Sequence, residues 1–146
     1  IIRKYTKQNY FYSNNDKNIH SNAIDKIYLK SYDNYKKRLS NLRINSKWGV
    51  EFYIYKNILI NTLGKIDLKN SNFFRKYTLQ NKNSKNSYFG NNYTTLRCHM
   101  DFNLFYGLLK RKYIWNQTLS GSLIFYERKP NKFDPNVTFS LNYLAE

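Results

Sequence analysis

Apolar residues recur at helical spacing in one early segment of the chain. Between residues 21 and 39 they are Ile24, Ile27, Tyr28, Tyr35 and Leu39. Ser21 can cap the first turn, and the basic residues 36–38 suit the negative end of the helix dipole. The pattern predicts a helix that begins at Ser21.

Strand patterns follow this helix. Residues 50–55 alternate between two faces, 56–57 can turn, and 58–63 are apolar and β-branched, which predicts a β-hairpin. A third strand, a mobile polar loop and a fourth strand are expected over residues 73–79, 81–87 and 93–99 respectively.

The last third of the chain returns to helical patterns. Asp101 can cap a helix over 102–112, residues 119–126 favour another strand, and Asp134 followed by Pro135 predicts a final helix to about Leu144. The sequence therefore predicts an α+β fold. It has a small, mostly antiparallel sheet of about four to five strands with three flanking helices. We expect a connecting arm over 1–20 and a single α+β domain over 21–146.

Composition adds a strong positive charge. The 146 residues include 25 Lys and Arg against 9 Asp and Glu, a formal charge of +16. Such a field attracts polyanions, but Asn, Lys, Ile, Tyr and Phe are also the residues that an AT-rich genome favours. The single cysteine suits a cytoplasmic setting, and no apolar run is long enough to span a membrane.

The sequence lacks the residues of a complete catalytic site. His20 and His99 are its only histidines, so neither His-x-His-x-Asp-His nor His-Glu-x-x-His occurs. Cys98 and His99 should point to opposite faces of a strand, which favours structural roles for both. The glycines are scattered and form no phosphate-binding loop. We therefore expect this chain alone to have no catalytic residues, metal ligands or cofactor.

Basic residues next to aromatic ones leave an alternative open. They occur at Arg75-Lys76-Tyr77 and at Lys110-Arg111-Lys112-Tyr113. Phosphate contacts combined with base stacking are typical of nucleic-acid binding, yet no known nucleic-acid-binding motif accompanies these clusters. A basic module for nucleic acid or another polyanion is the alternative function. A structural subunit of a large assembly is a third possibility. Arg111, Lys112 and Arg128 are the candidate anion contacts.

The most ordered pattern lies between residues 100 and 135. An amphipathic helix is followed by Trp115, by Gly121 and by Arg128-Lys129-Pro130-Asn131-Lys132-Phe133. This order resembles the C-terminal region of metallo-β-lactamase-fold enzymes of the CMP-N-acetylneuraminate hydroxylase type and their bacterial relatives. The matching positions are Trp115, Gly121, Arg128, Pro130 and Phe133.

The resemblance implies a non-catalytic C-terminal accessory domain of a metal-dependent hydrolase or oxidoreductase. Its substrate would be a sugar or nucleotide sugar, and Arg128 would be a candidate contact for an anionic group of that substrate. Zinc or iron would belong to an upstream catalytic domain, which would be the partner of this one. The chain opens at Ile1 without an initiator methionine, so we expect a C-terminal fragment. The five matching positions should have structural roles.

Overall fold

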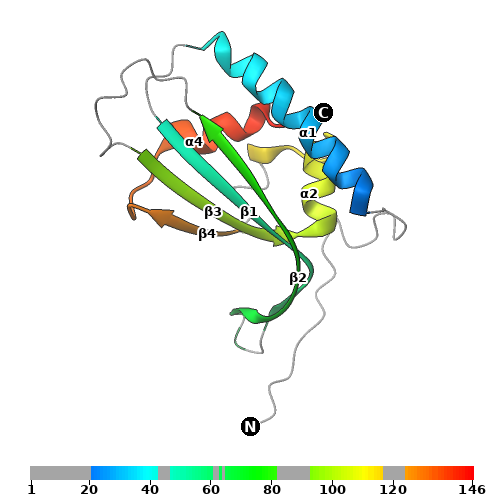
Figure 1. The fold of residues 1–146 in the computed structure, drawn as a ribbon. Coiled ribbons are helices and arrows are strands. Elements are labelled where there is room, and N and C mark those ends of the chain that lie inside the picture. The colour runs from blue at the N-terminus through cyan, green and yellow to red at the C-terminus, as the bar shows by residue number, and fades with distance from the viewer. Residues whose placement is uncertain (1–20, 43–46, 61–62, 64, 82–92, 117–123) are drawn as a thin grey trace.

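The computed structural model describes residues 21–42, 47–60, 63, 65–81, 93–116 and 124–146. Its elements follow the order α1 (Ser21–Ser40), β1 (Lys47–Ile60), β2 (Ile66–Asn81), β3 (Tyr93–Asp101), α2 (Phe102–Leu109), β4 (Phe125–Lys129), α4 (Pro135–Ser140) and the 3-10 helix η2 (Leu141–Tyr143). The described part of the chain thus contains both helices and strands, as the sequence patterns predict (Figure 1).

The strands form one mixed sheet in the order β2-β1-β3-β4. β1 pairs with β2 and β3 pairs with β4 in antiparallel fashion, whereas the two central strands β1 and β3 are parallel. The α+β fold with a mostly antiparallel sheet is therefore confirmed. The parallel central pair means that β1 and β3 both run towards the same end of the sheet, where β3 continues directly into α2.

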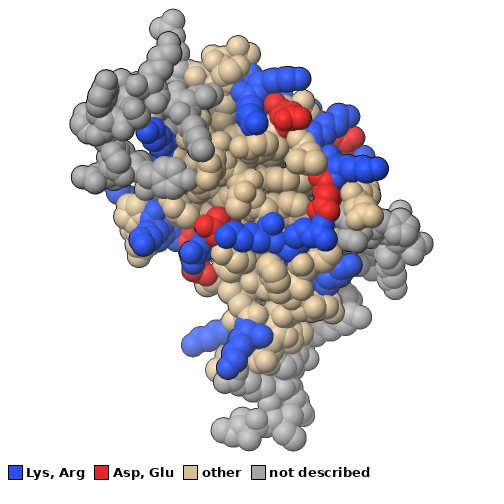
Figure 2. All heavy atoms as spheres, viewed as in Figure 1, with Lys and Arg blue, Asp and Glu red and all other residues tan. Residues whose placement is uncertain are grey.

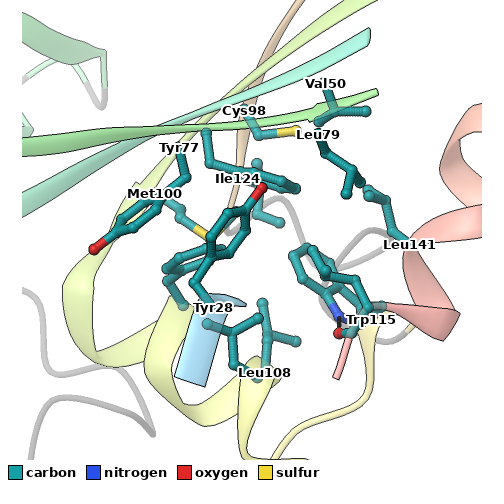
Figure 3. Packing of buried hydrophobic residues seen from close by; sticks show 14 of the residues in the cluster. Tyr28, Val50, Tyr77, Leu79, Cys98, Met100, Leu108, Trp115, Ile124 and Leu141 are labelled. Atoms are coloured by element: carbon teal, nitrogen blue, oxygen red, sulfur yellow. Dashed lines mark hydrogen bonds between the residues drawn. The ribbon is translucent and has the colours of Figure 1, made fainter. Parts of the chain in front are cut away.

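The helices lie together on one side of the sheet (Figure 1). β1 presents alternate residues to them, because successive side chains of a strand point to opposite faces. Val50 lies opposite Leu79 on β2 and Leu96 on β3, and all three are buried. Figure 3 shows such side chains pointing from the strands towards Leu108, Trp115 and others on the helical side. We call this side of the sheet the core face.

Helix α1 is held by aromatic side chains. Tyr28 and Tyr35 are buried, as expected from the helical spacing. The ring of Tyr28 packs against those of Phe52, Tyr77 and Phe105 at centroid distances of 6.4, 4.7 and 6.1 Å. None of the described helices is both long and apolar enough to cross a membrane.

The predicted turn at residues 56–57 is wrong. β1 continues to Ile60, with Asn57 opposite Asn72 and Leu59 opposite Asp67. Register irregularities between Ile54 and Leu59 allow the strand to bend without ending. The Lys56 ammonium lies over the rings of Phe74 and Phe102, 4.8 and 5.1 Å from their centroids. Residues 58–60 of the predicted second strand therefore belong to β1, whereas 61 and 62 lie outside the described residues. The predicted third strand, 73–79, is part of β2.

Three other boundaries differ from the sequence pattern. α2 ends at Leu109 instead of residue 112, and the last predicted helix is divided into α4 and η2. β4 begins at Phe125, while most of the predicted strand 119–126 lies outside the described residues. The predicted arm 1–20 and most of the loop 81–87 also lie outside them. The caps Asp101 and Asp134 are confirmed, since each carboxylate accepts a backbone N–H two residues later.

Candidate functional site

The second face of the sheet carries aromatic rings and charges in place of a packed apolar layer. We call it the open face. Tyr53 and Tyr55 of β1 lie there, opposite in register to His99 and Asp101 of β3. The ring of Tyr53 stacks on that of His99 at a centroid distance of 4.8 Å. Alternation explains this composition, because Phe52 and Ile54 point to the core face.

Two phenylalanines extend this aromatic surface to the outer strands. Phe73 of β2 lies 5.6 Å from the ring of Tyr55, and Phe125 of β4 lies 5.6 Å from the ring of His99. Their side chains remain 50% and 40% exposed. Exposed apolar rings that adjoin one another form a contact surface more readily than isolated ones do.

His99 lies at the centre of the open face and is hydrogen bonded on both ring nitrogens. Its Nδ1 is 2.9 Å from the Tyr55 hydroxyl oxygen, and its Nε2 is 2.8 Å from Oε1 of Glu127. Because a carboxylate only accepts, Nε2–H donates to Glu127 and the Tyr55 hydroxyl donates to Nδ1. Burial lowers the pKa of His99 below 6.5, although Glu127 opposes this shift. The ring is therefore neutral at pH 7.

The charges of the open face form ion pairs with one another. Glu51 accepts a hydrogen bond of 2.8 Å from the Tyr53 hydroxyl and lies 3.1 Å from Lys76 Nζ and 3.4 Å from Arg97 Nε. Arg97 also lies 3.8 Å from Glu127. Burial would raise the pKa of Glu51, but these partners outweigh it and the pKa is lowered. Glu51, Lys76, Arg97 and Glu127 thus form one network of ion pairs beside the aromatic rings of the open face.

The charged side chains of the basic cluster at residues 75–77 are also paired with carboxylates of the protein. The Arg75 guanidinium and the Tyr77 hydroxyl both donate to the carboxylate of Asp25 on α1. Lys76 points to the opposite face and pairs with Glu51. In the view of Figure 2, Lys and Arg side chains are spread over the surface, and several of them lie beside Asp or Glu.

The second basic cluster is placed differently. Lys110 pairs with Glu146 at 2.8 Å, and the Lys112 ammonium lies 5.5 Å from the centroid of the Tyr106 ring. Arg111 is exposed and lines a pocket together with Arg38. Of the candidate anion contacts Arg111 and Lys112, only Arg111 therefore lines the pocket, whereas Lys112 lies over an aromatic ring.

Four of the five residues that carry the resemblance lie in the described C-terminal part of the fold, namely Trp115, Arg128, Pro130 and Phe133. Trp115 is 3% exposed and its indole N–H donates to the Leu144 carbonyl at 2.9 Å. The Arg128 guanidinium lies over the rings of Tyr126 and Phe133, 5.9 and 5.2 Å from their centroids. It pairs with no carboxylate among the described residues. Pro130 follows a cis peptide bond, and Gly121 lies outside the described residues.

The described residues do not assemble a metal site. Within those ranges no group of three or more His, Cys, Asp and Glu side chains could hold a metal ion. Cys98 and His99 point to opposite faces, as expected, but both are buried. Burial raises the pKa of the Cys98 thiol, which keeps it protonated. His20 lies outside the described residues.

Sequence reasoning missed the arrangement around His99. Glu127 is 28 residues from His99 and Tyr55 is 44 residues from it. Only the parallel pairing of β1 with β3 and the antiparallel pairing of β3 with β4 bring them together. The alternation of Glu51, Tyr53 and Tyr55 was the one local signal that such a polar face existed.

Comparisons with known proteins do not assign the chain to a family. No protein-family model matches it, and neither the curated proteins nor the solved structures give a significant match.

Proposed function

We propose that this chain is a non-catalytic accessory domain of a metallo-β-lactamase-fold metalloenzyme that acts on a sugar or nucleotide sugar. It packs against the active-site domain through the open face of its sheet. The observation that carries this proposal is the composition of that face. Its rings of Phe73 and Phe125 are exposed, while the charges at its centre, on Glu51, Lys76, Arg97 and Glu127, are paired with each other. The centre of this surface can be buried without leaving any of these four charges unpaired.

The C-terminal signature supports the same proposal. Trp115 connects the segment after α2 to the Leu144 backbone, and Arg128 stacks on Phe133 beyond the end of β4. These contacts are architectural. The first ties the segment after α2 to the C-terminal backbone, and the second ties β4 to the segment that follows it. An accessory domain needs such a rigid support and no reactive groups of its own.

The first experiment is to determine the coding sequence upstream of Ile1 and to express the protein it encodes. We expect an uninterrupted reading frame with a His-x-His-x-Asp-His motif and metal bound only when that part is present. A start codon directly before Ile1 would overturn the proposal. So would more than about half an equivalent of zinc or iron on the purified 146-residue chain, because a structural or catalytic site binds its metal stoichiometrically.

The second experiment tests the docking surface in the longer protein. Phe73→Thr and Phe125→Thr keep good strand formers but remove the exposed rings. We expect faster amide hydrogen exchange on β1 and β3 of this double variant than of the wild type. The matched control is Phe139→Thr, since Phe139 is 53% exposed on α4. Equal exchange in the double variant, the control and the wild type would show that another surface makes the contact.

The alternative function is a basic module that binds nucleic acid or another polyanion. The charge of +16 favours it, whereas the ion pairs of Arg75 and Lys76 remove one of its two predicted clusters. Affinity for single-stranded RNA measured between 50 and 200 mM salt separates the two functions, because polyanion binding weakens steeply with salt. Tight and steeply salt-dependent binding would favour the alternative.

A further inference from the structure

A pocket of about 430 Å³ lies on the helical side of the molecule, away from the open face. It is bounded by the C-terminal half of α1, the segment that follows α2, and the last residues of the chain. Its polar lining comes from Arg38, Arg111 and Asn142, and its aromatic lining from Tyr113, Trp115 and Tyr143. A volume of this size accommodates a small organic molecule.

Arg38 is fixed in this pocket by the backbone of the C-terminal segment. Its Nη1 donates to the carbonyls of Tyr143 at 2.8 Å and Ala145 at 3.2 Å. A guanidinium has five N–H donors in a planar fork, so these two bonds leave most of its donors available. Among the described residues no carboxylate pairs with it.

The backbone conformation of Arg111 fixes its position at the same pocket as Arg38. It follows the end of α2 with a φ of 60°, the left-handed conformation in which glycine is usual. The bond of 2.8 Å from Lys112 N–H to the Gly107 carbonyl holds this turn. The nearby carboxylate of Glu146 is taken by Lys30 and Lys110. Arg111 therefore brings a second positive charge to the pocket without a described carboxylate to balance it.

The two guanidinium groups influence each other. Burial lowers the pKa of Arg38, and the charge of Arg111 lowers it further. Two like charges facing one pocket are stabilised when an anion lies between them. A charge of two matches a phosphate monoester, which carries close to two negative charges at neutral pH. Arginine also binds phosphate with paired N–H donors.

The remaining lining indicates what the phosphate is attached to. Trp115 and Tyr143 provide apolar and aromatic walls, which suit a planar or apolar group. The Asn142 amide donates to Asn116 and to the Phe139 carbonyl at 2.9 and 3.0 Å, which leaves its side-chain oxygen as an acceptor. We propose that this pocket binds a small organic phosphate monoester, with Arg38 and Arg111 on the phosphate and the aromatic walls on the organic group.

The test uses the 146-residue chain and phenyl phosphate as the probe, measured by isothermal titration calorimetry at low salt. Inorganic phosphate and benzoate are the comparison ligands. We expect saturable binding of one equivalent, with affinity for phenyl phosphate about tenfold or more above that for either comparison ligand, since each lacks either the organic group or the second charge.

Arg111→Gly is the decisive variant, because glycine suits the left-handed turn and the fold should be kept or stabilised. Its affinity for phenyl phosphate should fall by about tenfold or more through loss of a charge-assisted contact. Lys112→Ala is the matched control, since Lys112 does not line the pocket, and it should bind as the wild type does. Equal affinities of these two variants, binding of several equivalents, or no binding at all would overturn the proposal.

Discussion

Replacing Tyr35 by phenylalanine tests how the helical layer is fastened to the sheet. The Tyr35 hydroxyl accepts from the Trp48 indole N–H at 2.8 Å and donates to the Ser140 hydroxyl at 3.0 Å. Ser140 in turn donates to the Val137 carbonyl at 2.6 Å. This chain of hydrogen bonds joins β1, α1 and α4 inside the core, and all of its side chains are at most 1% exposed.

The expected cost follows from what the substitution leaves behind. In Tyr35→Phe the buried Trp48 N–H loses its acceptor, which lowers the free energy of unfolding by about 1–3 kcal/mol. Ser140 still donates its hydroxyl hydrogen to the Val137 carbonyl. Burial raises the pKa of Tyr35 to about 12, so the hydroxyl is protonated and donates throughout the neutral range. The free energy of unfolding should therefore fall by about 1–3 kcal/mol at pH 7.

Urea denaturation followed by tryptophan fluorescence and circular dichroism measures this loss. The matched control is Tyr32→Phe on the same helix, because the Tyr32 hydroxyl makes no hydrogen bond with the residues that the structure describes. We expect the control to lose less than about 0.5 kcal/mol. If Tyr35→Phe is no more destabilised than Tyr32→Phe, the hydrogen-bond chain does not stabilise the fold and this reasoning is wrong.

Three further perturbations test the core, a helix cap and the open face. A Cβ on Gly107 would lie 2.1 Å from Tyr113 Cε2, so Gly107→Ala should lower the free energy of unfolding by about 1–3 kcal/mol and weaken phenyl phosphate binding. Unchanged stability would refute this packing. Burial raises the pKa of Asp101 to about 6, so the charged cap costs stability as the pH rises through that value. Asp101→Asn, which still caps α2, should match or exceed the wild type in denaturation at pH 8, whereas Asp101→Ala should lose about 1 kcal/mol. The lowered pKa of His99 contributes stability that is present above 6.5 and lost as the pH falls below it. Thermal unfolding between pH 7.5 and 5 should therefore be less pH-dependent in His99→Gln than in the wild type, and identical profiles would contradict the neutral ring.

Local patterns predicted the elements of this fold better than their ends. The helical spacing of Ile24, Tyr28 and Tyr35 identified α1 because all three are buried on one side of it. Lys56 and Asn57 were misread as a turn because polarity alone does not distinguish a turn from an irregular strand. The continuation of β1 depends on its pairing with β2, and no local window of sequence contains that information.

Local sequence also does not show which charged side chains are paired with one another. That pairing determines which of them can bind a ligand. Arg75 is part of the more conspicuous basic cluster, yet its guanidinium is paired with Asp25, 50 residues away in sequence. Arg38 is one of the basic residues that suit the C-terminal end of α1, and its sequence context gives no sign of a ligand site. The fold places it with Arg111 in a pocket where no described carboxylate balances either charge. A sequence reveals how many cations a chain has, whereas pairing across the fold determines which remain available to an anion. In this protein we therefore expect an anion to bind in the pocket beside Arg38 and Arg111, not across a broad basic surface.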